Sequence, residues 1–134
     1  MNTTTKSIFD HSFDYAKTLL EDTRQCYPFG AFVDNSGQVH PLEFDTEGIK
    51  NIPDNETVRN SLRTYCETEI AEGRIIAWGL TYEAIVQLEE DSEGTDTIAI
   101  DIYSKDEDNI PVYYTPYSLG EGSVDFGETF AVAR

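Results

Sequence analysis

The feature that most constrains the fold is an alternation of apolar and polar side chains in the second half of the chain. Two segments, 80–88 and 96–103, carry this alternation. A period of two turns successive side chains to opposite faces of a strand, so each segment is expected to form a strand with one buried face. The charged connection 89–95 is short enough for the two strands to pair antiparallel. The residues expected to face inward are Leu80, Tyr82, Ala84, Val86, Leu88, Ile98, Ile100 and Ile102.

Two earlier segments, 7–25 and 54–72, have the spacing of amphipathic helices instead. Asp54 is a favoured N-cap residue, and Gly73 stands where a helix of this length commonly ends. The apolar stripes are expected to consist of Phe9, Phe13, Ala16 and Leu20 in the first helix and Val58, Leu62, Tyr65 and Ile70 in the second.

Shorter apolar runs complete the order of elements. Segments 29–33 and 38–44 flank a turn at 34–37 and predict a hairpin, while 110–117 and 126–133 predict two final strands. The expected order is α-β-β-α-β-β-β-β in a single domain, residues 1–134. The expected fold is a two-layer α+β domain, in which both helices cover one face of an antiparallel sheet of five to six strands.

The charge of the chain limits what it can bind. The net charge is -17, from 26 Asp and Glu against 9 Lys and Arg, and residues 83–108 hold ten of the acids with one base, Lys105. A field of this sign repels phosphate backbones and anionic lipid, so binding to nucleic acid or to a membrane is not expected. Such acidity is also typical of salt-adapted hosts, and in that case it carries no information about function.

The N-terminal segment and the cysteines predict the compartment. Residues 1–6 have no apolar stretch of the signal-peptide kind, and no segment reaches the roughly 20 apolar residues of a membrane span. Cys26 and Cys66 are too few for a disulfide framework. We expect a cytoplasmic protein with both thiols reduced.

Residue types that enzymes use are present without the spacing that catalysis needs. His11 and His40 are not placed to form a nucleophilic triad, and Cys66 is followed by acidic residues that would raise the pKa of its thiol. The segment 120–122 lacks the third glycine and the following helix of a phosphate-binding loop. We therefore expect no enzymatic activity, no catalytic residue and no cofactor.

Two acidic turns, around 89–96 and 106–108, contain oxygen ligands of the type that Ca²⁺ and Mg²⁺ prefer. Neither turn matches an EF-hand, and consecutive carboxylates point in different directions. We expect solvated turns without a metal, at opposite ends of the strand 96–103. As candidates for contact with a protein partner, the turns contribute Glu89, Glu90, Asp91, Glu93, Asp106, Glu107 and Asp108.

A second candidate surface is apolar. Tyr113 and Tyr114 are adjacent on a strand and must point to opposite faces, so one of them projects away from the helices. Ile85 and Tyr103 are expected on that same outer face, where the three side chains would form an apolar patch for a partner or for a second copy of the chain. Scattered surface tyrosines on a twisted sheet are an equally favoured interpretation.

The segments 27–34 (YPFGAFVD) and 73–79 (GRIIAWG), with Pro116–Tyr117 and Phe126–Gly127, resemble a family of small uncharacterised bacterial proteins. The resemblance covers most of the chain and implies a small domain without a catalytic residue. The order of elements is also similar to that of roadblock and profilin-like domains, which implies a dimerising or scaffolding module.

Three functions follow as hypotheses. The first is a non-enzymatic cytoplasmic interaction domain with a protein partner, which includes a homodimer. The second is an acidic inhibitor or immunity-type protein that neutralises a basic partner, since complementary fields speed encounter. The third is a hydrolase that uses carboxylates and a divalent metal, which requires acids from different strands to meet in a concave site.

Overall fold

The computed structural model describes residues 1–44, 51, 53–88 and 93–134. It confirms the α+β class, the antiparallel sheet and the expected order of elements, with one further short strand at 123–126, directly before the segment 126–133 that was predicted as the last strand. In the described residues the elements are α1 (Thr3–Thr23), β1 (Phe29–Asp34), β2 (Val39–Leu42), α2 (Asn55–Ala71), β3 (Ile75–Val86), β4 (Thr95–Ser104), β5 (Val112–Gly120), β6 (Ser123–Phe126) and β7 (Phe130–Val132).

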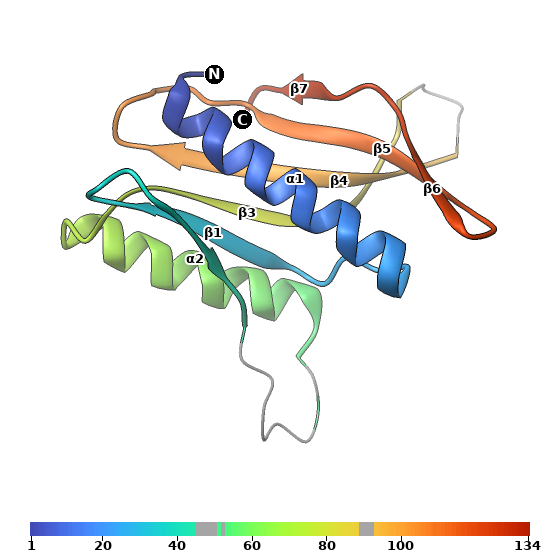
Figure 1. Ribbon diagram of the computed structural model, residues 1–134, viewed down its shortest axis with the longest axis horizontal. Coiled ribbons are helices and arrows are strands. Elements are labelled where there is room, and N and C mark those ends of the chain that lie inside the picture. Colours follow the sequence, from blue (N-terminus) through green and yellow to red (C-terminus); the bar gives the residue numbers. More distant parts are fainter. Residues whose placement is uncertain (45–50, 52, 89–92) are drawn as a thin grey trace.

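The described strands form one antiparallel sheet in the order β2-β1-β3-β4-β5-β6 (Figure 1). β7 pairs with the first part of β5, while β6 pairs with its last part. The longest ladder joins β3 and β4, where Trp78 lies opposite Tyr103 and Leu80 lies opposite Asp101. Directly opposed residues point to the same face, and successive residues point to opposite faces. The register therefore determines, for each residue of β3 and β4, on which of the two faces its side chain lies.

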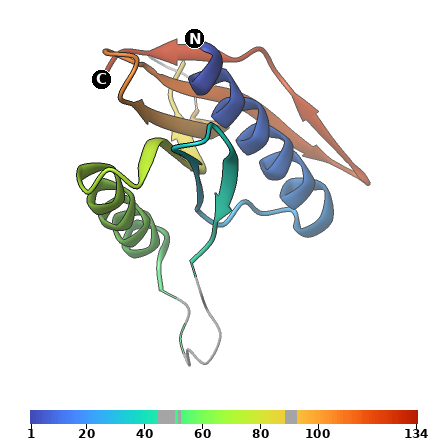
Figure 2. The same ribbon diagram turned by 60° about the vertical axis from the view of Figure 1, so that its left-hand side comes forward.

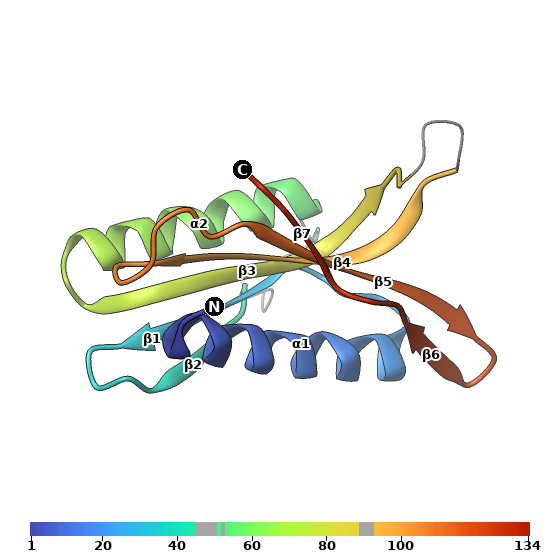
Figure 3. The ribbon, with the colours of Figure 1, turned by 90° about the horizontal axis from the view of Figure 1, so that it is seen from above.

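The two helices lie on opposite faces of the sheet, so the expectation that both cover one face of a two-layer fold is wrong (Figures 2 and 3). Ala77 of β3 packs on the α1 side, and its neighbour Trp78 packs on the α2 side. The physical reason is visible in segments 29–33 and 75–80, which are almost continuously apolar rather than alternating. Strands buried on both faces have such runs.

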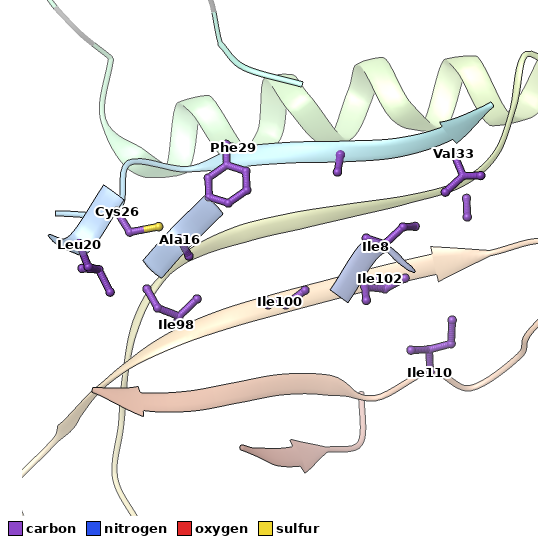
Figure 4. Packing of buried hydrophobic residues seen from close by; sticks show 12 residues of the cluster. Ile8, Ala16, Leu20, Cys26, Phe29, Val33, Ile98, Ile100, Ile102 and Ile110 are labelled. Atoms are coloured by element: carbon purple, nitrogen blue, oxygen red, sulfur yellow. The ribbon is translucent and has the colours of Figure 1, made fainter. Parts of the chain in front are cut away.

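The α1 side holds the larger of the two cores (Figure 4). Ile98, Ile100 and Ile102 of β4 project from the sheet toward the helix, and each is fully buried. Ile8 of α1 sits directly over Gly79, where a Cβ atom would come within 2.8 Å of the Ile8 Cγ2 atom. The absence of a side chain at residue 79 therefore lets α1 approach the centre of the sheet.

The α2 side is covered less completely. α2 packs on β3 and β1 through Val58, Leu62 and Cys66, which meet Trp78 and Leu80. The helix begins at its predicted N-cap, because an Asp54 carboxylate oxygen accepts a hydrogen bond from the Thr57 amide. The main contacts of α2 with the sheet are to β3 and β1, and not to the strands from β4 onward. Neither helix in the described part of the chain has the length and apolar character that crossing a membrane requires.

Each core contains one free, buried cysteine, Cys26 on the α1 side and Cys66 on the α2 side. Burial raises the pKa of both thiols to about 12, and neighbouring glutamates add to the effect. The sheet separates the two sulfur atoms. The expectation of a raised thiol pKa at Cys66 is confirmed, with burial as the larger cause.

Gly79→Ala is expected to destabilise the protein by about 1–3 kcal/mol, because the new methyl group overlaps Ile8. In an Ile8→Ala background, which alone should cost about 2–5 kcal/mol, the Gly79→Ala penalty should largely disappear. Urea unfolding of the four proteins measures this coupling. Gly30→Ala is the control, because its Cβ would meet the backbone oxygen of Gly79 and not Ile8. Equal Gly79→Ala penalties in both backgrounds would contradict the contact.

Neither thiol is expected to react with a disulfide reagent in the folded protein at pH 8, because both are buried and their pKa lies near 12. Both should react promptly in urea, where a thiol pKa of about 8.5 applies. Since folding raises these pKa values, the stability that the neutral thiols contribute is complete below about pH 8.5 and is lost as the pH rises toward 12. Ellman titration with and without urea measures the reactivity, and rapid native-state reaction would show that one core opens readily.

Candidate functional site

Three of the nine basic residues gather on the α2 side of the sheet, and two of them form ion pairs with one buried carboxylate. Arg59 and Arg63 stand four residues apart on α2, so they share one helix face, and Arg134 comes from the segment after β7. We call this group the Asp101 cluster. Its residues are Arg59, Arg63, Trp78, Tyr82, Asp101, Tyr103 and Arg134.

Asp101 is the acidic centre of the cluster and is only 4 % exposed. Its Oδ2 atom lies 3.5 Å from Nη2 of Arg63, and its Oδ1 atom forms an ion pair with Nη2 of Arg134. Arg134 also donates hydrogen bonds to the backbone oxygens of Ile102, at 2.8 Å, and Ile110, at 2.9 Å. A carboxylate is tolerated at this depth because two guanidinium groups compensate its charge.

Tyr103 connects the two arginines. Its hydroxyl oxygen accepts hydrogen bonds from Nη1 of Arg63 at 3.1 Å and from Nη1 of Arg134 at 2.7 Å. Its ring stacks on Trp78 at a centroid distance of 4.4 Å, and the guanidinium of Arg134 lies 4.0 Å from the centroid of the same ring. Cation–π contact and hydrogen bonding therefore hold the ring and the arginines in one arrangement.

The same pattern repeats one turn earlier on α2, where the guanidinium of Arg59 lies 4.6 Å from the Tyr82 ring centroid. Burial, together with the charge of Asp101, raises the pKa of Tyr82 above its ordinary value, so its hydroxyl stays protonated. Burial lowers the pKa of Arg63, but the Tyr103 hydroxyl and Asp101 outweigh this effect and the net pKa is raised. Both shifts keep Tyr82 neutral and Arg63 charged at neutral pH.

Beside the cluster lies an open cavity of about 450 Å³. Tyr103, Arg134 and Ile70 line it together with acidic and polar residues of the β4–β5 turn. Its size suits one or two side chains of a partner or a small ligand. The ring of Tyr103 and the guanidinium of Arg134 are therefore accessible to a molecule that enters this cavity.

Two rows of directly opposed residues run from under α2 to the far edge of the sheet. In the row that begins at Leu80, the exposed fraction of the side chains increases outward, from the buried Leu80 and Asp101 to Val132, which is 44 % exposed. The ring of Tyr114 stacks on that of Phe130 at 5.6 Å. The rows are Tyr82–Ala99–Tyr114–Phe130 and Leu80–Asp101–Val112–Val132.

We call the outer part of these rows, with the neighbouring Tyr103 and the two arginines bonded to it, the interaction face. It is an aromatic and aliphatic surface beside two guanidinium groups, both about a third exposed at 33 % and 32 %. Its residues are Arg63, Tyr103, Tyr114, Phe130, Val132 and Arg134.

The predicted apolar patch is divided between the two faces of the sheet. Tyr103 and Tyr114 do share the α2 side, but Tyr113 packs edge-on against Phe9 of α1 at 5.6 Å. Ile85 is 76 % exposed and lies on the α1 side, two residues along β3 from Glu83, which accepts a hydrogen bond from the Cys26 amide. The expectation placed Leu80 and Ile98 on one face, whereas the register puts them on opposite faces.

The acidic turns lie at opposite ends of β4, as expected from the order of strands. Glu89, Glu90 and Asp91 fall outside the described residues, while Glu93, Asp106 and Asp108 are exposed. Glu107 has a structural contact instead. One of its carboxylate oxygens accepts hydrogen bonds from the Asn2 amide and the Thr5 hydroxyl, each at 2.9 Å, and these bonds lower the pKa of Glu107.

The arrangement offers little to catalysis or metal binding in the residues that the structure describes. No group of three or more His, Cys, Asp or Glu among them is placed to hold a metal ion. His40 Nε2 lies 2.6 Å from Asp34 Oδ2, but the hydroxyl of Ser36 donates to the same carboxylate rather than to the imidazole. This pattern stabilises the β1–β2 turn and is not a nucleophilic triad.

Comparisons of the chain with protein-family models, with curated proteins and with solved structures found no match.

Asp101→Asn is expected to destabilise the protein by about 1–3 kcal/mol, because it removes the charge that compensates two partly buried arginines. Asp10→Asn makes the same chemical change at an exposed ion pair with Lys6 and should cost less than about 0.5 kcal/mol. Urea unfolding at neutral pH measures both. Equal effects of the two substitutions would show that the Asp101 cluster contributes no more than a surface pair.

Proposed function

We propose that the protein is a non-enzymatic interaction domain that binds a protein partner through the interaction face. The observation that supports this most strongly is the gradient of exposure along the row Leu80–Asp101–Val112–Val132, from two buried residues to an exposed one, beside the stacked and partly exposed rings of Tyr114 and Phe130. Tyrosine, arginine and buried aromatic neighbours are the residues that contribute most binding energy at protein interfaces.

The face is also organised before any partner arrives. The hydrogen bonds of Tyr103 and the ion pairs of Asp101 fix Arg63 and Arg134 in place, so little side-chain entropy remains to be lost on binding. The adjacent cavity can accept a side chain of the partner. The net charge of -17 opposes close approach of a second copy, which favours a different protein as the partner.

A second candidate function is an acidic inhibitor or immunity-type protein that neutralises a basic partner. It is supported by the net charge and by the exposed carboxylates of Glu93, Asp106 and Asp108 in the two turns. Binding of this kind depends on long-range attraction, which salt screens over about 8 Å at physiological ionic strength.

Val132→Asp is expected to weaken partner binding by about tenfold or more, because it places a charge in the exposed part of the interaction face. Ile85→Asp, which also charges an exposed aliphatic side chain on a strand but on the other face, should bind as the wild type does. The measurement is quantitative capture of proteins from the native lysate on immobilised wild type and variants, at low and high salt.

The outcomes separate the candidates. Capture that resists high salt and is lost only with Val132→Asp supports the interaction face. Capture that disappears with salt and is equal for both variants supports the charge-driven inhibitor. A mass twice that of the chain in light scattering, reduced by Val132→Asp, would assign the face to a homodimer and contradict the proposal of a different partner.

A further inference from the structure

A second cavity, of about 220 Å³, lies between the last turns of α1 and the end of β2. Four aromatic rings and one carboxylate line it. We call it the aromatic cage, and its residues are Tyr15, Tyr27, Phe29, Glu43 and Phe44. It shares no residue with the interaction face.

Three separate segments build the cage. α1 supplies Tyr15, the connection from α1 to β1 supplies Tyr27, and the residues after β2 supply Glu43 and Phe44. Phe29 at the start of β1 is 3 % exposed, and the ring of Tyr15 stands almost perpendicular to it, with centroids 4.7 Å apart and planes at 85°.

Hydrogen bonds fix the hydroxyl groups of both tyrosines of the cage. The hydroxyl of Tyr27 donates to the backbone oxygen of Pro53 at 2.8 Å. The hydroxyl of Tyr15 donates to Oε1 of Glu43, and this bond, together with burial, raises the pKa of Tyr15 to about 12. Tyr15 therefore stays neutral and keeps the Glu43 carboxylate at the edge of the cavity.

This combination of groups selects for a cation. Aromatic faces carry partial negative charge, and a cation within about 6 Å of a ring centroid is attracted to it. Glu43 adds a full negative charge, and a carboxylate has capacity beyond the one hydrogen bond that Tyr15 donates. A neutral apolar group would desolvate that carboxylate without compensating it, and an anion would be repelled.

The size of the cavity limits the cation to a small one. Drug-sized ligands and cofactors occupy cavities of about 300–1,000 Å³, and the cage, at about 220 Å³, is below that range. A compact ammonium group fits a space of this size better than the planar guanidinium of arginine, which stacks on a single ring face. The net charge of -17 concentrates basic proteins near the surface.

We propose that the aromatic cage binds the ammonium group of a lysine side chain presented by a protein partner. Only the source of the lysine rests on the proposed function, because the cage binds the group through its own rings and carboxylate. A variant of the interaction face therefore separates the two proposals.

The test uses N-acetyl-lysine methylamide as the probe and N-acetyl-norleucine methylamide as its neutral counterpart. Backbone amide shifts of Tyr27 and Phe44 in nitrogen–proton NMR spectra follow the titration. We expect saturable shifts with the lysine probe and none with the norleucine probe. Glu43→Gln should weaken binding about tenfold, whereas Glu21→Gln, the same change at an exposed site on α1, should leave it unchanged.

Phe44→Leu should weaken binding as well, because it keeps the apolar volume and removes one ring. Unchanged dispersion of the remaining amide signals shows that each variant is folded. Val132→Asp should bind the probe normally even if it loses the partner, which keeps failure of the interaction face distinct from failure of the cage.

Equal binding of both probes, or equal affinities of Glu43→Gln and Glu21→Gln, would overturn the cage as a cation site. Choline is the third probe, because it carries a quaternary ammonium group and has no peptide groups. Binding of choline with no binding of the lysine probe would assign the cage to a free organic cation and overturn lysine as its occupant.

Discussion

The antiparallel register of β3 and β4 is the constraint on which the rest of the structure depends. With Leu80 opposite Asp101, the three isoleucines of β4 point to α1 and form the larger core. The same register sends Asp101 and Tyr103 to the other face, where the arginines of α2 can reach them. A shift by one residue would bury Asp101 among the isoleucine positions without a cation, so the core and the charged cluster specify the same pairing.

The sequence was sufficient to predict the elements but not the faces they occupy. Alternation in 80–88 and 96–103 predicted two paired strands, and the helical stripes predicted α1 and α2. Which strand face meets which helix depends on register, which a period of two leaves open. The unbroken apolar runs at 29–33 and 75–80 were the one available signal of burial on both faces.

The candidate sites were harder to predict for the same reason. Tyr103 was predicted as a candidate from the sequence. Asp101, Arg63 and Arg134 come from three distant segments, and no local sequence pattern predicts that they lie together. Only the spacing of Arg59 and Arg63 was visible, as two cations on one helix face. Three guanidinium groups against one carboxylate leave the Asp101 cluster at +2 and the rest of the chain at -19. The net negative charge of the protein therefore comes from residues outside the Asp101 cluster.

The bond between Asn2 and Glu107 joins residues 105 positions apart. This bond and the contacts of the β4 isoleucines show that α1, the first helix to be synthesised, packs chiefly against strands that are synthesised much later. Contacts of such long range are made slowly, because the loop must close before they contribute any stability. During synthesis α1 can make only its contacts with β1, β2 and β3 until β4 emerges, so the part of its apolar face that packs on β4 stays exposed until then.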